Sequence, residues 1–223
     1  MKRCTGVLMV ALMVALPLGT LAKGSGTFSF AVSKAGKVTG RMDVRVSRRD
    51  GGIFATSAFT PGVAAVKEHK KGKLTVRTYA ELGRDGTIGK FKRWEGEQYW
   101  FAFVYDKVLK VRYEKTSGVP GSVRDLGAIK AVPLDTEQPH LAWLLADSGQ
   151  NSVACVGLHP TRTGQAAIQK AGADEEIDVL NGMKARVTRW TVSGDCGEYV
   201  VYVDPDGSPR VMVAGEARFD RMP

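Results

Sequence analysis

The chain has 223 residues, with 32 Lys or Arg against 23 Asp or Glu and a formal net charge of +9. This basic excess is moderate and spread along the chain. The length suits one sizeable hydrophobic core, and neither a low-complexity linker nor a repeat of fixed period divides the sequence. These features exclude a repeat architecture and a string of linked domains, so we expect one domain from residue 23 to residue 223.

The N-terminus has the residue order of a secretory signal. Lys2 and Arg3 precede the apolar run "VLMVALMVALPLG", and the small residues Thr20 and Ala22 suit cleavage after Ala22. The apolar run has about 13 residues, whereas a helix that crosses a membrane needs roughly 20. The sequence therefore predicts a signal peptide over residues 1–22 and a periplasmic or secreted protein.

Charge gives a weak indication of partners. Without Lys2 and Arg3, 30 basic residues face 23 acidic ones, a formal charge of +7. The densest basic cluster, "KEHKKGK" at 67–73, is either a solvated hairpin tip or a basic lip that attracts anionic lipid or a cell-envelope polymer. Export argues against a nucleic-acid partner. The expected partners are an apolar or anionic envelope molecule and a peripheral membrane contact, and any protein partner is left open.

Two cysteines remain after cleavage, Cys155 and Cys196. In an oxidising compartment, an isolated pair most often forms a structural disulfide. Such a bridge would stabilise the fold by about 4 kcal/mol in the chain-entropy model. The alternative is a nucleophilic thiolate, but His159 is the only histidine near either cysteine in sequence.

Alternating residues predict strands along most of the chain. Residues 27–47 alternate apolar and polar side chains on both sides of the turn "KAGK", which predicts a hairpin with one buried and one wet face. Residues 197–219 predict a second hairpin around "DPDG". Strand-like runs at short intervals between them are typical of a meander.

The run "YWFAFVY" at 99–105 is apolar on both faces. Tyr99, Phe101, Phe103 and Tyr105 share one face, and Trp100, Ala102 and Val104 share the other. Such a strand is either buried on two sides or lines a cavity that accepts an apolar guest.

The segment "EQPHLAWLLA" at 137–146 predicts the single helix. Thr136 suits the N-cap, Pro139 is tolerated in the first turn, and Gly149 suits the end. Leu141, Leu144 and Leu145 share one face at helical spacing, with Trp143 near its edge. We expect this helix to seal one opening of a β-rich body, with His140 as a hydrogen-bonded structural residue.

Motifs for catalysis or metal binding are incomplete. "ADSGQ" lacks the second glycine of a protease nucleophile segment, the three histidines are isolated, and "DPDG" lacks the other ligands of a calcium loop. The sequence therefore predicts no catalytic residue, metal or cofactor. A hydrolase would have to use His140, Asp147 and Ser148.

Three features together carry a resemblance. They are the hairpin pattern F-x-V-x-x-x-G-K-x-x-G from Phe30 to Gly40, the leucine helix after Pro139, and the D-x-D-G turn at 204–207. In this order they resemble exported bacterial β-rich domains of unknown function, distantly similar to periplasmic lipoprotein carriers. The resemblance implies a curved antiparallel sheet that holds acyl chains against a helical lid, and it provides no catalytic residues. The chain departs from the carriers in having one short helix instead of several.

These observations predict a mainly β protein, a curved antiparallel sheet as a half-barrel or two-layer sandwich with one short central helix. We expect a non-enzymatic cell-envelope protein that binds a lipid or other apolar ligand in the sheet. A structural or assembly protein that acts through protein contacts is the alternative, and a hydrolase is the third hypothesis. The expected ligand-binding residues are Tyr99, Phe101, Phe103, Tyr105, Leu141, Trp143 and Leu144.

Overall fold

A computed structural model describes residues 25–49, 51–62, 76–115, 121–146, 148–158 and 161–223. The expected signal peptide at 1–22, the basic cluster at 67–73 and Asp147 lie outside the described residues. Within the described residues, no helix is long and apolar enough to cross a membrane.

The described chain is built almost entirely from strands. The first group is β1 (Gly26–Lys34), β2 (Lys37–Arg49), β3 (Gly52–Pro61), β4 (Val76–Leu82), β5 (Ile88–Glu95), β6 (Gln98–Tyr105), β7 (Val108–Glu114), β8 (Ser122–Asp125) and β9 (Val132–Leu134). One α-helix, α2 (His140–Ala146), follows. The second group is β10 (Ser152–Leu158), β11 (Thr161–Lys170), β12 (Glu175–Asp178), β13 (Lys184–Gly194), β14 (Gly197–Val203), β15 (Pro209–Ala214) and β16 (Ala217–Arg221), with the 3₁₀ turn η1 (Leu180–Gly182) before β13.

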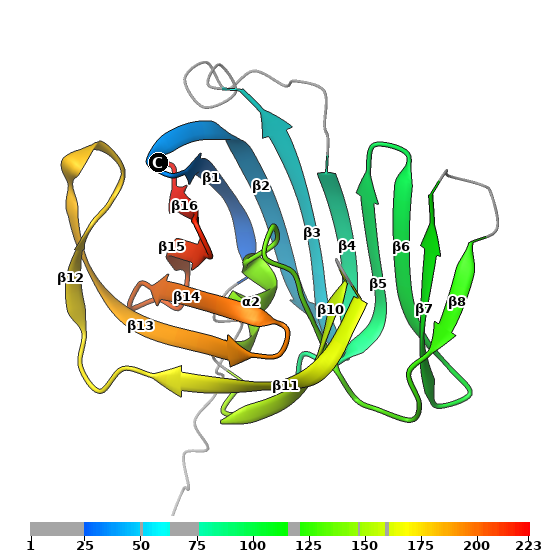
Figure 1. Ribbon diagram of the computed structural model, residues 1–223. Helices are drawn as coiled ribbons and strands as arrows, with labels where there is room; N and C mark the ends of the chain where they lie inside the picture. Colours follow the sequence, from blue (N-terminus) through cyan, green and yellow to red (C-terminus); the bar gives the residue numbers. More distant parts are fainter. Residues whose placement is uncertain (1–24, 50, 63–75, 116–120, 147, 159–160) are drawn as a thin grey trace, which may run out of the picture.

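All sixteen strands belong to one open, mostly antiparallel sheet. Its order is β8-β7-β6-β5-β4-β3-β2-β1-β16-β15-β14-β13-β11-β10-β9, with β12 paired to β13 off this path. The pair β9–β10 is parallel. The sheet curls around α2 (Figure 1) until the segment before β9 meets β5, where the Ile88 N–H donates to the Ala131 carbonyl at 2.8 Å. This confirms the predicted curved sheet with one central helix.

Both predicted hairpins are present. β1 and β2 pair around the "KAGK" turn, and β14 and β15 pair around "DPDG". On β2, Met42, Val44 and Val46 are buried, while the intervening residues are half-buried or exposed. Val38 is exposed, because it lies next to the turn and beyond the register shift between Val32 and Ser33.

The core occupies the inside of the curl, with α2 at its centre. All seven residues of α2 are buried. The three leucines that share a face are buried, and so are the other four residues, because the helix contacts β9 on one side and strands β11, β13, β14 and β15 on others. A short helix surrounded by sheet needs apolar side chains all round.

The helix begins later than predicted, and Asp135 rather than Thr136 organises its entry. The Asp135 carboxylate accepts a hydrogen bond from the Glu137 N–H at 2.9 Å, and its carbonyl accepts one from the Gln138 N–H at 2.8 Å. This turn precedes the first helical residue, His140. At the other end Gly149 has a φ of 71°, as expected for a glycine after a helix.

The predicted disulfide is confirmed. Cys155 on β10 is bonded to Cys196 in the turn between β13 and β14, with the two Cα atoms 6.3 Å apart. The bridge therefore ties two hairpins together inside the core. Beside it, the Tyr199 hydroxyl donates to the Cys196 carbonyl at 3.0 Å.

Candidate functional site

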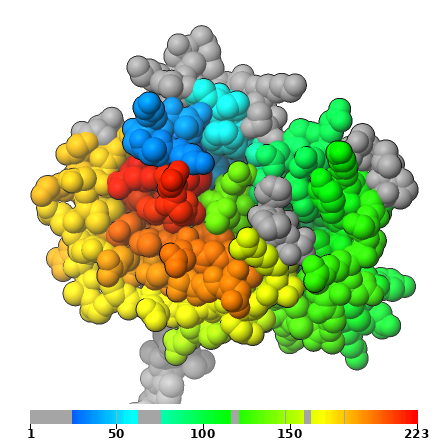
Figure 2. All heavy atoms as spheres, in the orientation of Figure 1, coloured from blue at the N-terminus to red at the C-terminus, as the bar shows by residue number. Residues whose placement is uncertain are grey.

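A cleft of about 550 Å³ opens between β1, β3 and β4 on one side and β15 and β16 on the other. The segment 136–138, which leads into α2, also lines it: Gln138 is buried and marks the inner end of the cleft, whereas Thr136 and Glu137 are exposed. In Figure 2, the yellow-green atoms of the segment that leads into α2 are visible between two groups of atoms. The red atoms of β15 and β16 lie on one side, and the cyan-to-green atoms of β3 and β4 lie on the other. The apolar walls consist of Val32, Phe59, Val76, Ala214, Ala217 and Phe219.

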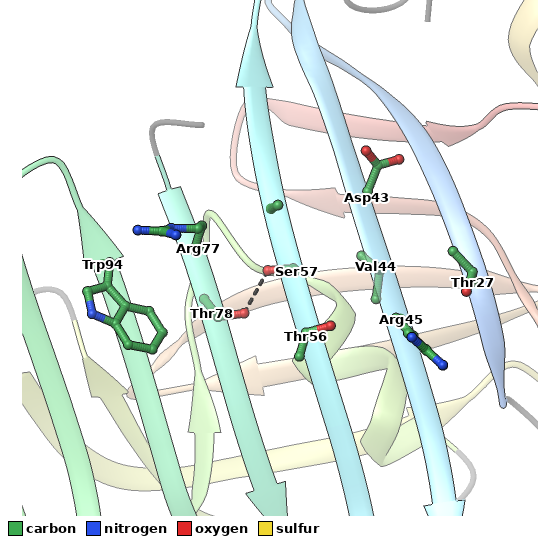
Figure 3. Close-up of a pocket in the computed structure, with 10 residues that line it drawn as sticks. Thr27, Asp43, Val44, Arg45, Thr56, Ser57, Arg77, Thr78 and Trp94 are labelled. Carbon is green, nitrogen blue, oxygen red and sulfur yellow. Dashed lines mark hydrogen bonds between the residues drawn. The ribbon is translucent and has the colours of Figure 1, made fainter. Parts of the chain in front are cut away.

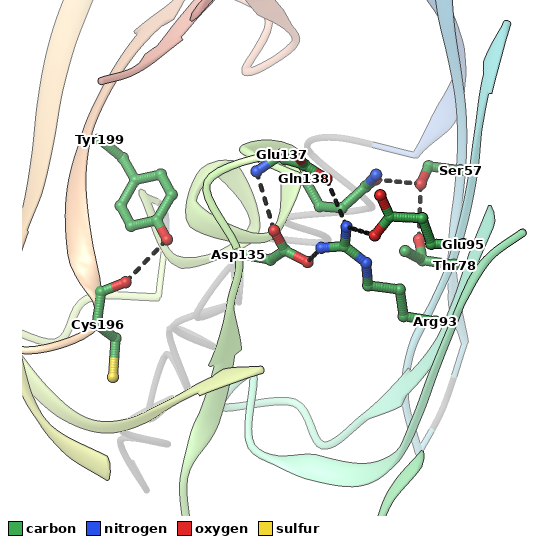
Figure 4. A network of polar contacts seen from close by, with 9 residues as sticks. All are labelled: Ser57, Thr78, Arg93, Glu95, Asp135, Glu137, Gln138, Cys196 and Tyr199. Carbon is green, nitrogen blue, oxygen red and sulfur yellow. Dashed lines mark hydrogen bonds and ion pairs between the residues drawn. The ribbon is translucent and has the colours of Figure 1, made fainter. Parts of the chain in front are cut away.

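A cluster of ions around one buried arginine supports the inner end of this cleft. Arg93 on β5 is fully buried, and its guanidinium forms ion pairs with Asp135 and Glu137 and, at 2.8 Å, with Glu95 (Figure 4). The guanidinium also lies 5.4 Å from the ring centre of Trp100. A buried charge is tolerated only where such partners replace water.

Burial and opposite charge shift the pKa of each buried member of this cluster, Arg93 and Asp135, in opposite directions. Burial alone would lower the pKa of the Arg93 guanidinium, but Asp135 and Glu137 outweigh it and raise that pKa. Burial raises the pKa of the Asp135 carboxyl, and the Arg93 charge opposes that rise. Arg93 therefore stays cationic and holds the carboxylates of the helix entry in place.

A second, uncharged network joins the sheet to the same segment. The hydroxyls of Ser57 on β3 and Thr78 on β4 are 2.6 Å apart, and the Ser57 hydroxyl also bonds to the Gln138 side-chain carbonyl (Figure 4). All three side chains are buried. These bonds fix Gln138 at the inner end of the cleft.

The polar groups of the cleft are more acidic than basic. Glu95, Glu137 and Glu216 line it together with a single lysine, Lys34. Glu95 and Glu137 are paired with Arg93, whereas Glu216 has no ion pair among the described residues. The arrangement can enclose an apolar body between Phe59 and Phe219, and its carboxylate oxygens can accept hydrogen bonds from a polar end.

The structure does not bring the two halves of the sequence-predicted site together. Tyr99, Phe101, Phe103 and Tyr105 lie on the face of β6 turned away from the helix, because Trp100 and Ala102 fill the inward face. They are half-buried, apart from Tyr105, which is exposed.

The helical residues of that predicted site lie in the core. Leu141, Trp143 and Leu144 are buried and do not line the cleft. The Trp143 Nε1–H donates to the Gly207 carbonyl at 3.1 Å, and its ring meets Phe28 edge-on at 5.4 Å. Trp143 thus anchors the helix to the "DPDG" turn.

Sequence reasoning missed Arg93 and the cleft walls. Arg93 shares the inward face of β5 with the buried Phe91. A charged residue at a strand position where alternation predicts an apolar side chain was the sequence feature that could have indicated its role. Phe59 and Phe219 are far apart in sequence, and no local pattern pairs them.

The two described residues of the hydrolase hypothesis, His140 and Ser148, do not line the cleft. His140 is fully buried, and neither ring nitrogen has a hydrogen-bond partner among the described residues, so the expected hydrogen-bonded histidine is not found. Burial lowers the pKa of its imidazole to about 3. The Ser148 hydroxyl accepts a hydrogen bond from the Gln150 N–H at 3.4 Å, in the role of a turn residue.

The described part of the chain holds no group of three or more His, Cys, Asp or Glu placed to bind a metal ion. No family model, curated protein or solved structure matches this chain.

Proposed function

We propose that the protein is a non-enzymatic binding protein of the cell envelope, which holds an apolar or amphiphilic ligand in the cleft between β1, β3, β4 and β15–β16. The observation that carries this proposal is the combination of apolar walls with a fixed polar inner end. Small-molecule sites are typically concave, mostly apolar and provided with a few fixed polar groups. A volume of about 550 Å³ suits such a ligand.

The charges of the cleft define the polar end of that ligand. Three carboxylates and one lysine line the cleft, and Glu216 forms no ion pair among the described residues, so an acidic head group would meet like charge there. A neutral or cationic end with hydrogen-bond donors suits these acceptors better. The ligand class we propose is therefore an uncharged or cationic amphiphile, for which Phe59 and Phe219 provide the apolar contact.

Two observations support the location. The N-terminal residues have the pattern of an export signal, and Cys155 and Cys196 are joined in a disulfide, the state that an oxidising compartment maintains.

The proposal is tested by filling the cleft. Ala217, half-buried in the cleft wall, is replaced by Trp, and Ala167, half-buried on β11 next to the inward-facing Ala166, is replaced by Trp as the control. Binding of a neutral apolar fluorophore is measured by titration, and lipid carried by the protein from its native envelope is identified by mass spectrometry after extraction. We expect Ala217→Trp to weaken binding at least tenfold and Ala167→Trp to leave it unchanged. Absence of both carried lipid and fluorophore binding, or equal binding by the two variants, would refute the proposal.

One observation favours the alternative, a structural or assembly protein that acts through protein contacts. β8 ends the sheet, all four of its residues are exposed, and no described strand pairs with its free edge. An open edge can accept a strand from a partner. Val123→Pro on that edge should abolish recovery of a specific partner by cross-linking if β8 is the contact, and should leave fluorophore binding intact.

A further inference from the structure

The outer face of the sheet carries a continuous row of aromatic rings. Trp94 on β5 meets Tyr99 on β6 at 5.5 Å between ring centres. Tyr99 meets Phe101 at 6.2 Å, and Phe101 meets Phe103 at 4.6 Å. All four rings are half-buried and lie on the face opposite to the buried Trp100 and Ala102. We call Trp94, Tyr99, Phe101 and Phe103 the aromatic row.

Cations lie directly over this row. The Arg77 guanidinium is 5.9 Å from the Trp94 ring centre, and the Lys92 ammonium is 5.3 Å from that of Phe101. Lys90 stands opposite Phe103 in the strand register. Among the described residues, Arg77, Lys90 and Lys92 form no ion pair, although Glu81 stands opposite Lys90 in the strand register.

The row ends at an exposed, apolar hairpin tip. At the end of β6, the exposed fractions of Val104 and Tyr105 are 45% and 67%. Lys107 follows in the turn with a φ of 63°, and the Lys110 ammonium lies 5.8 Å from the Tyr105 ring centre. The tip therefore combines apolar side chains with Lys107 and with Lys110, which is ion-paired with Asp125 at 3.2 Å, and Asp106 lies in the same turn.

The other end of the row meets a shallow groove of about 480 Å³ on the same face. Trp94 and Arg77 lie at one end of this groove and Arg45 towards the other, while the yellow-green ribbon of α2 lies behind the strands (Figure 3). Among the described residues, Arg45 forms no ion pair. The basic aromatic face thus extends from the β6–β7 tip back to β2.

The chemistry of this face matches an anionic bilayer surface. Aromatic rings concentrate at the level of lipid head groups, and Lys and Arg extend their charged ends to phosphates while their stems cover apolar surface. Phe101, Phe103 and Val104 have no side-chain hydrogen-bonding group, so they gain from hydrocarbon contact and not from the hydroxyls of a polysaccharide. A contiguous row of partly exposed rings with a polar rim is the kind of patch that marks an interaction surface.

We propose that the outer face of β5–β7 is a docking surface for an anionic lipid bilayer. The tip at Val104 and Tyr105 enters the head-group region, and Lys90, Lys92 and Arg77 lie at the phosphates. This inference does not depend on the cleft, whose apolar walls are on other strands and to which β5–β7 contribute only Glu95 among the lining residues. It gives the protein a way to present that cleft close to a membrane.

The test is co-sedimentation of the ligand-free protein with vesicles of phosphatidylglycerol and phosphatidylcholine, compared with vesicles of phosphatidylcholine alone. The variant Lys90→Glu/Lys92→Glu removes the charges beside the row. Lys37→Glu/Lys170→Glu makes the same charge change at two exposed lysines on β2 and β11. Since basic residues near such a surface contribute to its binding and this change reverses two of them, we expect at least a tenfold loss for the first pair. We expect less than a threefold loss for the second.

Apolar insertion has its own variant, Phe103→Thr/Tyr105→Thr, whose β-branched residues suit a strand. We expect it to lose at least fivefold in vesicle affinity. Vesicles whose acyl chains are brominated should quench the tryptophan fluorescence of the wild type more than that of Trp94→Phe. Ala217→Trp should bind vesicles like the wild type, which separates this test from that of the cleft.

Absence of binding to anionic vesicles, or an equal loss in both lysine pairs, would overturn the proposal. Binding to a soluble anionic polysaccharide that vesicles do not compete away would also overturn it, and would assign the face to a polymer.

Discussion

The guanidinium of Arg93 and the carboxylate of Asp135 form an ion pair inside the protein, although 42 positions separate them in sequence. Arg93 lies on β5, and Asp135 forms the turn that leads into α2. The side chains are 0% and 2% exposed, so neither charge has water as an alternative partner. The pair therefore fixes the helix entry, and with it the inner end of the cleft, to the wall of the sheet.

Removing Arg93 should destabilise the protein strongly. Arg93→Met leaves Asp135 buried without its cation, and loss of one partner of a buried pair typically costs about 3–5 kcal/mol. Denaturant unfolding measures the loss. Lys184→Met is the control, because Lys184 and Glu176 are 66% and 61% exposed, and such a surface pair contributes little to stability.

The double variant Arg93→Met/Asp135→Leu should recover part of that loss, since no charge is then left buried. If Arg93→Met cost no more than Lys184→Met, the pair would not be holding the helix entry.

His140 should make stability depend on pH. Burial lowers the pKa of its imidazole to about 3 in the folded protein, against about 6.5 in an unfolded chain. Between these values the unfolded chain binds a proton that the folded protein excludes. The free energy of unfolding therefore falls as pH falls below about 6.5, by about 1.4 kcal/mol per pH unit from this group, and is unaffected by it at higher pH.

The measurement is urea unfolding of the wild type and of His140→Leu at intervals from pH 7.5 to pH 5, a range above most carboxyl titrations. The difference in unfolding free energy between the two proteins should grow with a slope of about 1.4 kcal/mol per pH unit below about pH 6.5. A difference that stays constant across this range would show that the buried imidazole does not resist protonation.

The disulfide should contribute a large part of the stability. Both cysteines are buried, and their sequence separation of 41 corresponds to about 4 kcal/mol in the chain-entropy model. Cys155→Ala/Cys196→Ala should lower the unfolding free energy by about 2–5 kcal/mol. Wild-type protein unfolded in a strong reductant should behave like the variant. If the reductant left the wild type unchanged, the bridge would not be formed in solution.

The parts of this fold that are predictable from sequence are those in which neighbouring residues show a local pattern. The β1–β2 and β14–β15 hairpins follow from a period of two around a turn, and the disulfide follows from cysteine parity and the export signal. The curl of the sheet around the helix has no such local pattern in the sequence. Nothing local to α2 indicates that the sheet surrounds it on all sides.

The site was harder to predict for the same reason. On β6 both faces carry aromatic or apolar residues, so alternation could not decide whether Trp100 or Tyr99 faces the helix. The cleft joins Phe59 to Phe219 from strands that become close only when the sheet curls. Arg93, at an inward position beside Phe91, is the one residue whose buried role could have been suspected.

Gly86 should be intolerant of a side chain because of its position against the end of α2. It has a φ of 80°, and a Cβ atom there would lie 2.7 Å from Leu145 Cδ2. Gly36 has a similar φ of 75° with nothing within 4 Å, so Gly36→Ala measures the backbone cost alone, about 1–2 kcal/mol. Gly86→Ala should cost about 1–3 kcal/mol more, because the helix must shift or Leu145 must leave its rotamer.

Thermal unfolding of the two glycine variants, each with and without Leu145→Ala, separates the two effects. Shortening Leu145 removes the crowded methyl group, so the extra cost of Gly86→Ala should shrink in that background while the cost of Gly36→Ala stays the same. If the two glycine variants cost the same in protein that keeps Leu145, Gly86 is required for its backbone conformation alone. That result would also mean that α2 has room to move at this end of the curl.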